Sequence, residues 1–194
     1  MPLPKIPLKR RCSWPIAGDK LYEDYHDLEW GVPLYDDQKI FEFLVLESAQ
    51  AGLSWRTVLY KRENYRKAFA GFDPQKVARF IPQDVEKLLK NAGIIRNRLK
   101  IAAAINNAQR FLEIQKEFGT FSKYIWGFVG GKPIRNTWKT LKDLPVITPE
   151  SEALARNLKK RGFKFLGPTV IYAHMQATGM VNDHSVDCFR YKEV

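Results

Sequence analysis

The chain has 194 residues, and its 32 Lys and Arg against 21 Asp and Glu give a formal net charge of +11, which indicates a polyanionic partner. Its hydrophobic content of 45% is ordinary for a globular protein, and the lack of an apolar run of about 18 residues excludes a transmembrane span. Two cysteines are too few for a disulfide scaffold, so we expect a cytoplasmic protein with reduced thiols. The basic, proline-broken start lacks the continuous apolar region of a signal peptide. We expect residues 1–11 to be a flexible tail and residues 12–190 to form one domain. That domain could consist of two helical lobes with a pocket between them.

Apolar periodicity and the positions of capping residues, Gly and Pro predict a succession of helices. Asp36 follows a Val32-Pro33 break and is the expected N-cap of the first one. The predicted helices run from Asp36 into residue 51 and then over residues 56–71, a short stretch from 73, 81–91, 96–118, 121–129, 148–161 and 168–178. Residues 130–146 are irregular, and no alternating run of sheet length appears. The sequence therefore predicts an all-α fold.

Aromatic side chains are dense in the first 55 residues, where they include Trp14, Tyr22, Tyr25, Trp30 and Trp55. Aromatic planes that face one another can accept a flat nucleobase between them. Such residues are more often part of a core, so their number alone does not decide between a core and a pocket.

Glu47 is the most unusual residue of the first predicted helix. Apolar or small residues between Ile40 and Ser48 repeat at three- and four-residue spacing, and Glu47 lies at the edge of that face. A carboxylate turned toward a core is costly unless a cation or a hydrogen-bond donor meets it. The following Gly52, Leu53 and Trp55 make this region resemble the floor and lip of a pocket. The alternative is a Glu that reaches water or pairs with an Arg.

Two cysteines and two histidines form a possible metal-binding set. Cys12 and His26 lie early in the chain, whereas His184 and Cys188 lie late, at a four-residue spacing that places them on one face of a helix. A Cys₂His₂ set is sufficient for a closed tetrahedral zinc site, which here would join the two chain ends. Buried thiols and ordinary histidines are the alternative. His174 is left over, and a helix surface or core position would explain it.

The segment KKRGFKFLGPT, residues 159–169, connects the last two predicted helices. Gly162 and Gly167 allow a tight hairpin whose backbone N–H groups can face an anion, and the next helix adds its positive N-terminus. Lys159, Lys160, Arg161 and Lys164 surround it. The segment suits a phosphodiester contact that reads no sequence. A solvated basic turn is the alternative.

Together these residues resemble the 3-methyladenine DNA glycosylase I family of the helix-hairpin-helix superfamily of base-excision enzymes. The resemblance covers nearly the whole chain after residue 11. The matching stretches are CSW at 12–14, YHDLEWGVP at 25–33, LESAQAGLSW at 46–55, KRENYR at 61–66, AGIIRNRLKI at 92–101, KKRGFKFLGPT at 159–169 and VNDHSVDC at 181–188.

The resemblance assigns roles to the residues singled out above. It implies that Glu47 is the pocket carboxylate that hydrogen-bonds the alkylated adenine, and that Leu53, beside Gly52, fills the gap left by the flipped nucleotide. The hairpin from Gly162 through Lys164 to Gly167 would grip phosphates. The base would be lined or stacked by Trp14, Tyr22, Tyr25, Trp30 and Trp55. One structural zinc ion would be bound by Cys12, His26, His184 and Cys188.

No lysine of the sequence stands out as a Schiff-base nucleophile, so we expect a monofunctional enzyme that does not cleave the strand. Many superfamily members use an aspartate about 20 residues past the hairpin, but this family is understood to work without it. Asp183 lies beside a predicted ligand, which favours a supporting role at the metal, and Asp187 has no evident role. We expect a monomer that acts on double-stranded alkylated DNA, releases free 3-methyladenine and binds no membrane. The alternatives are a zinc-stabilised reader of damaged DNA that cuts nothing, and a glycosylase for another lesion such as 7-methylguanine or hypoxanthine.

Overall fold

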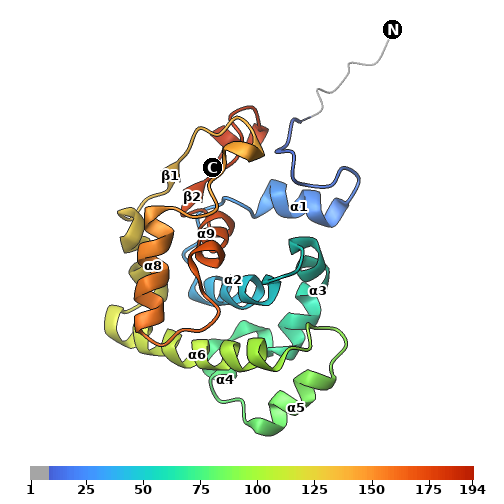
Figure 1. The fold of residues 1–194 in the computed structure, drawn as a ribbon, viewed down its shortest axis with the longest axis vertical. Coiled ribbons are helices and arrows are strands. Elements are labelled where there is room, and N and C mark those ends of the chain that lie inside the picture. The colour runs from blue at the N-terminus through green and yellow to red at the C-terminus, as the bar shows by residue number, and fades with distance from the viewer. Residues whose placement is uncertain (1–8) are drawn as a thin grey trace.

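The helix α2 (Asp37–Gln50) runs through the centre of the molecule, and the other helices are arranged around it (Figure 1). The computed structural model describes residues 9–194, so most of the expected tail lies outside the described residues. Asp36 caps α2 as predicted, because its carboxylate accepts a hydrogen bond from the backbone N–H of Lys39 at 2.8 Å. Every residue from 40 to 49 is buried, so α2 is enclosed on all sides and not only along one face.

Helices account for most of the described chain. α3, α6, α7 and α9 pack directly on α2. In chain order, the α-helices besides α2 are α1 (Lys20–Leu28), α3 (Trp55–Ala68), α4 (Pro74–Val77), α5 (Pro82–Lys90), α6 (Arg98–Phe118), α7 (Phe121–Trp126), α8 (Pro149–Lys160) and α9 (Pro168–Ala177). None of the helices between residues 9 and 194 combines the length and the apolar character needed to cross a membrane.

The predicted helices are present, with differences at three places. α1 was not predicted, although Asp19 caps it by accepting a hydrogen bond from the N–H of Tyr22 at 3.3 Å. α3 ends at Ala68 and not at residue 71, because the chain turns there with Gly71 at a φ of +70°. α7 ends at Trp126, and its predicted continuation, Gly127–Val129, is a 3-10 helix.

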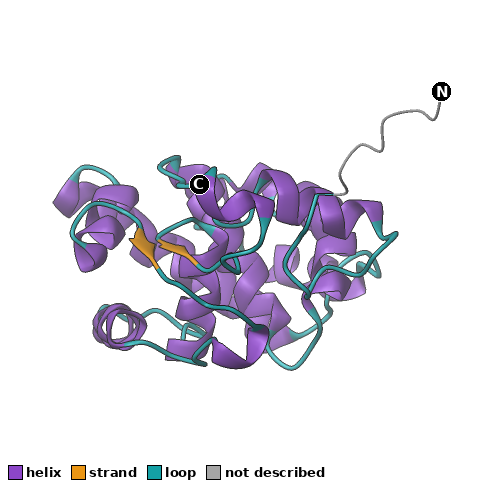
Figure 2. Cartoon of the chain, turned by 90° about the horizontal axis from the view of Figure 1, so that it is seen from above, coloured by secondary structure: helices purple, strands orange, loops and turns teal. Residues whose placement is uncertain are grey.

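The prediction of an all-α fold is wrong in one detail, because two short strands pair in parallel (Figure 2). β1 (Ile134–Arg135) lies in the stretch predicted to be irregular, and β2 (Val181–Asn182) follows α9. The register pairs Ile134 with Val181 and Arg135 with Asn182. Strands of two residues are too short to show alternation, and their partners are far apart in the sequence. The pairing fixes the chain just before Asp183 and His184.

The two ends of the described chain lie side by side. The backbone N–H of Phe189 donates to the carbonyl of Arg10 at 2.8 Å, and the Arg10 guanidinium pairs with Asp187 at 2.6 Å. Arg11 forms a further ion pair with Asp27, also at 2.8 Å. Asp187 therefore joins the two ends, and the contacts of the folded part begin by residue 10.

Candidate functional site

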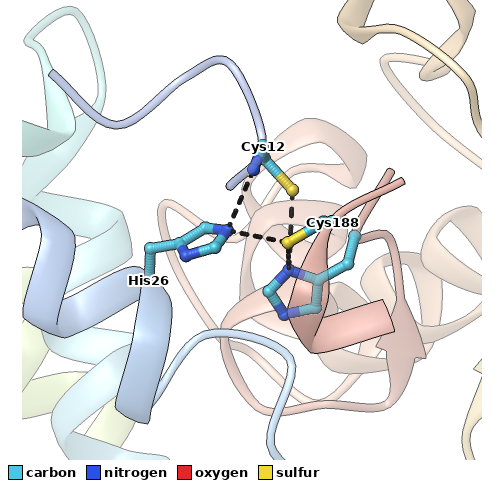
Figure 3. A group of neighbouring side chains, drawn as sticks. Cys12, His26 and Cys188 are labelled. Carbon is cyan, nitrogen blue, oxygen red and sulfur yellow. Dashed lines mark hydrogen bonds between the residues drawn. The ribbon is translucent and has the colours of Figure 1, made fainter. Parts of the chain in front are cut away.

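The four predicted metal ligands come together in one buried cluster (Figure 3). Cys12 precedes α1, His26 lies in its last turn, and His184 and Cys188 lie in the segment after β2. Their ligand atoms all lie within 4.8 Å of one another. The Cys12 thiol also donates toward Cys188, which lowers the pKa of Cys188 and favours a thiolate there. Two sulfurs and two imidazole nitrogens so arranged can hold a metal ion.

Both histidines are held in one orientation by acceptors outside the cluster. His26 Nδ1 lies 2.7 Å from the Asp27 carboxylate, which leaves Nε2 toward the sulfurs. His184 Nε2 lies 3.0 Å from the Trp30 carbonyl, which leaves Nδ1 toward them. A Cβ at Gly31 would lie 2.9 Å from His184 Nε2, so only glycine fits beside that ring. Such outer partners fix the tautomer of metal-binding imidazoles, and Asp27 was not predicted to act here.

Two expectations about this region are wrong. His184 and Cys188 do not share a helical face, because the chain between them is a loop followed by a turn. Their side chains meet nonetheless, with Cys188 Sγ 3.6 Å from His184 Nδ1. Asp183, expected to support the metal, is bonded elsewhere.

Asp183 is buried and accepts four hydrogen bonds from neutral donors. Its Oδ1 accepts from Asn136 Nδ2 and Trp138 Nε1, each at 2.7 Å. Its Oδ2 accepts from the Tyr172 hydroxyl at 2.6 Å and from Gln176 Nε2 at 2.8 Å. The carboxylate therefore joins the loop after β1 to α9, and its acceptor sites are occupied.

The predicted pocket residues line a single cavity of about 260 Å³ next to the cluster. Gln50, Leu141, Leu144, Ala173 and Gln176 complete its wall and were not predicted. Gln50 lies one helical turn past Glu47, so helical spacing could have predicted that it lies beside Glu47 in the wall. Leu141 and Leu144 belong to the irregular stretch, where no periodicity indicates their position. The predicted residues in the lining are Trp14, Tyr22, Tyr25, Trp30, Glu47 and Trp55.

Glu47 is an acid without a partner in this wall. Its side chain is 4% exposed, and burial raises the pKa of Glu47 from 4.5 to about 8. Desolvation is the only contribution to that shift, so no ion pair with an Arg of the described residues offsets it. The arginines go instead to Glu42 on the same helix, which accepts from Arg62 at 2.8 Å and Arg66 at 2.7 Å. At neutral pH Glu47 is mostly protonated, and a cationic occupant would favour release of that proton to solvent.

The aromatic rings around the cavity are inclined to one another, edge to face around Trp14 and tilted between Tyr25 and Trp55. Trp14 contacts Tyr22 and Trp30 with ring centroids 5.2 and 5.1 Å apart, and Tyr25 lies 5.2 Å from Trp55. The indole N–H groups of Trp14 and Trp55 are buried without an acceptor in residues 9–194. A buried donor without a partner is costly, so these groups suit a ligand that brings acceptors.

A second, smaller cavity of about 190 Å³ shares Glu47, Gln50 and Ala173 with the first. Gly52 and Leu53 line it together with residues of α9. Gly52 has a φ of +80°, a conformation that favours glycine, and the turn leaves Leu53 41% exposed. The predicted wedge therefore lines a cavity that Glu47 also lines.

The turn 161–167 between α8 and α9 is held from α6. Asn106 donates to the Gly162 carbonyl at 2.8 Å, and Asn107 bonds both the N–H and the carbonyl of Lys164. Positive φ occurs at Gly162 (+87°) and Phe165 (+57°) but not at Gly167, so the predicted freedom of Gly167 is not used. Lys159, Lys160 and Lys164 are exposed.

Arg161 does not join these exposed lysines, because its guanidinium forms a bidentate pair with Glu117.

A larger cavity of about 550 Å³ lies between α1, α2 and α3, and none of the predicted site residues lines it. Its charged floor, Glu42 with Arg62 and Arg66, is already paired.

Comparisons with known proteins give one consistent result. A family model described as methyladenine glycosylase matches residues 14–191. The chain is 51% identical to DNA-3-methyladenine glycosylase 1 of Escherichia coli K12 over 181 residues, which is 93% of this chain and 96% of the relative. A crystal structure of 3-methyladenine DNA glycosylase I superposes with a TM-score of 0.90 at 52% identity, covering 93% and 98% of the two chains. The Staphylococcus aureus 3-methyladenine DNA glycosylase I, solved to explain 3-methyladenine recognition, gives a TM-score of 0.86 at 41% identity, covering 89% and 92%.

Proposed function

The chain belongs to the methyladenine glycosylase family, and on that premise we propose that it is a base-excision repair enzyme that removes 3-methyladenine from alkylated double-stranded DNA. The relatives described above are named for this activity. The observation that carries the proposal is the cavity in which Glu47 meets five aromatic side chains, among them Trp14 and Trp55 with unpaired N–H groups.

The cavity selects a flat base that carries positive charge. Alkylation at N3 makes adenine in DNA cationic, and a carboxylate among aromatic faces favours a cation through Coulomb and cation–π attraction. Glu47 would release its proton to solvent as the base enters. Its carboxylate would then pair with the cationic base, and this pairing would offset the cost of burying the charge. A neutral, undamaged base gains nothing from that exchange. Discrimination thus follows from charge as well as shape.

Extrusion of the nucleotide costs a few kcal/mol and needs contacts outside the cavity. Leu53 would fill the space left in the base stack, as apolar wedges do in other proteins that distort DNA. The turn 161–167 would hold the backbone through its N–H groups and the exposed Lys164. Both elements border α9, which also lines the cavity.

Hydrolysis exchanges the base for water at the anomeric carbon. The bond from C1′ to the base breaks with its electron pair going to the base, which leaves neutral. The oxygen of water bonds to C1′ and gives up a proton to solvent. No lysine takes part as a nucleophile, so the strand stays intact and an abasic site remains. The positive charge already on the base lowers the demand on the enzyme, whose main task is recognition.

We propose zinc as the ion of the Cys₂His₂ cluster. Zn–S bonds of about 2.3 Å and Zn–N bonds of about 2.05 Å at tetrahedral angles put S and N about 3.6 Å apart. Three distances support this: Cys12 Sγ to His184 Nδ1 is 3.5 Å, Cys188 Sγ to His26 Nε2 is 3.5 Å, and Cys188 Sγ to His184 Nδ1 is 3.6 Å. When bound, the ion would supply a closed structural tie between the chain ends and no chemistry at the base. Metal analysis of the purified protein should find one zinc per chain.

Incubation with methylated duplex DNA, followed by chromatography of the released bases, tests the activity. We expect free 3-methyladenine and intact strands. Tight binding without any released base would indicate the non-cutting reader. Release of 7-methylguanine or hypoxanthine in place of 3-methyladenine would indicate a glycosylase for another lesion. Release of 3-methyladenine with strand breaks at neutral pH would contradict the monofunctional mechanism.

A further inference from the structure

The C-terminal end of α2 bears both Glu47 and the Gly52–Leu53 turn, yet it has no stabilising group of its own. No basic residue lies in the last turn of α2. Carbonyl groups at the end of a helix have no partner within the helix, and they carry partial negative charge. The carbonyl of Gln50 is used by the N–H of Leu53 at 2.6 Å, which forms the turn. The carbonyls on either side of it need donors from elsewhere.

Lys100 supplies them from a distant part of the chain. Its ammonium donates to the carbonyl of Ala49 at 2.8 Å and to that of Ala51 at 2.6 Å. Lys100 is itself fixed in the first turn of α6, where its N–H donates to the Asn97 cap at 3.1 Å. A single charge therefore holds the carbonyls that flank Gln50.

We propose that Lys100 is a positioning residue that holds the Gly52–Leu53 turn in place for DNA, an inference that rests on the proposed function. Gly52 allows the turn its φ of +80° but gives it no rigidity, and Leu53 is 41% exposed, so packing holds its side chain only in part. Two charge-assisted hydrogen bonds from α6 supply that rigidity. Lys100 would thus act on the DNA through Leu53 and not by touching a phosphate.

Leu53 is the means of testing this, because a residue that acts only through Leu53 has little effect once Leu53 is gone. Lys100→Met removes the ammonium but keeps a long apolar side chain. In the wild-type background we expect it to slow single-turnover release of 3-methyladenine about tenfold. In a Leu53→Ala background the same change should cost less than about threefold, because the two residues are coupled.

Lys61 provides a matched control on another helix. Its ammonium donates to the Ala92 carbonyl at 3.1 Å, a bond of the same kind that does not touch the end of α2. Lys61→Met should have the same effect on release with and without Leu53. Should Lys100→Met fail to fold, Lys100→Gln, which keeps an uncharged donor, is measured in the same two backgrounds with the same expectation.

A second readout is independent of base release. Affinity for a duplex with a tetrahydrofuran abasic site, relative to an intact duplex, should fall in Lys100→Met, while the salt dependence of binding to intact DNA stays at its wild-type slope. Equal effects of Lys100→Met with and without Leu53, or a slope lower by about one, would overturn the inference in favour of independent support or a phosphate contact. Wild-type protein that releases no base would instead refute the proposed function, and the abasic-site measurement would still decide the role of Lys100.

Discussion

Replacement of Glu47 by Gln should make the folded protein more stable, by an amount that grows with pH. Burial raises the pKa of Glu47 from 4.5 to about 8, so folding favours the protonated acid. Below pH 4.5 the acid is protonated in both the folded and the unfolded state, and burial of its charge costs nothing. Between pH 4.5 and about 8 the unfolded chain ionises while the folded one resists, so the folded state loses stability.

The size of the effect follows from the linkage between protonation and folding. A tenfold difference in proton affinity corresponds to about 1.4 kcal/mol, so the folded protein should lose roughly 3 kcal/mol by pH 7 and about 5 kcal/mol above pH 8. Glutamine keeps the shape of the side chain and never ionises. We therefore expect the advantage of Glu47→Gln to be close to zero at pH 4.5 and to increase up to about pH 8.

Urea denaturation of both proteins between pH 4.5 and 8.5 measures this difference, with Glu42→Gln as a matched control. Glu42 lies on the same helix and is equally buried, but its carboxylate holds Arg62 and Arg66. Its neutralisation should destabilise the protein by about 2 kcal/mol, because Arg62 and Arg66 lose the buried carboxylate that they share and keep only Glu29 and Glu63 as partners. The same chemical change should thus have opposite signs at two positions five residues apart.

The role proposed for Glu47 in base binding predicts a second effect of the same variant. Excision of 3-methyladenine should fall, and binding to undamaged DNA should not change, because the cavity is empty there. A Glu47→Gln protein that is less stable than wild type at pH 8 and fully active would refute the reasoning. Glu47 would then be a structural residue, and the cationic base would have to bind elsewhere.

Three further changes test other parts of the molecule. Cys188→Ala should lose its zinc by metal analysis and unfold at a lower urea concentration, and a variant that keeps its stability without metal would contradict the closed site. Leu53→Ala should reduce binding to an abasic-site duplex by roughly tenfold without changing the salt slope. Lys164→Glu should instead lower that slope by about one, and an unchanged slope would place the DNA on another face. His174 is buried with both ring nitrogens unpaired in the described chain, and burial lowers its pKa to about 3, so stability is lost as pH falls from 6.5 toward 3. His174→Leu should therefore stabilise the protein by about 1 kcal/mol at pH 7 and about 2 kcal/mol more at pH 5, measured by urea denaturation.

The sequence predicted what depends on local signals. Caps and prolines placed most helices to within a few residues. The spacing of Glu47 among apolar residues indicated a buried acid as one of two alternatives, and the structure shows that it is buried. The helix α1 was missed, although Leu21, Tyr25 and Leu28 repeat at helical spacing and the Asp19 cap was a usable signal. The division into two lobes, the monomeric state and the cytoplasmic location stay predictions.

What the sequence could not predict depends on contacts between distant segments. The strands β1 and β2 pair across more than 40 residues with two residues each, and no periodicity precedes such a pair. The four donors to Asp183 come from two segments whose proximity only the fold creates. For the same reason, proximity to His184 in the sequence gave a wrong role for Asp183, and Asp27 supports the cluster instead.

The Cys₂His₂ cluster and the cavity are coupled through the chain, although none of the four cluster residues lines the cavity. Cys12 lies two residues before Trp14, His26 follows Tyr25 directly, and the Trp30 carbonyl accepts from His184. Three of the five aromatic residues that line the cavity, Trp14, Tyr25 and Trp30, are thus held next to the cluster. The cavity is lined by the desolvated acid Glu47 and by the unpaired indole N–H groups of Trp14 and Trp55, whose burial destabilises the empty site. Contacts outside the cavity are therefore needed to hold these side chains in place. A metal ion bound in the proposed site would therefore support the geometry of the cavity, because it would fix the segments that the cavity alone would tend to release.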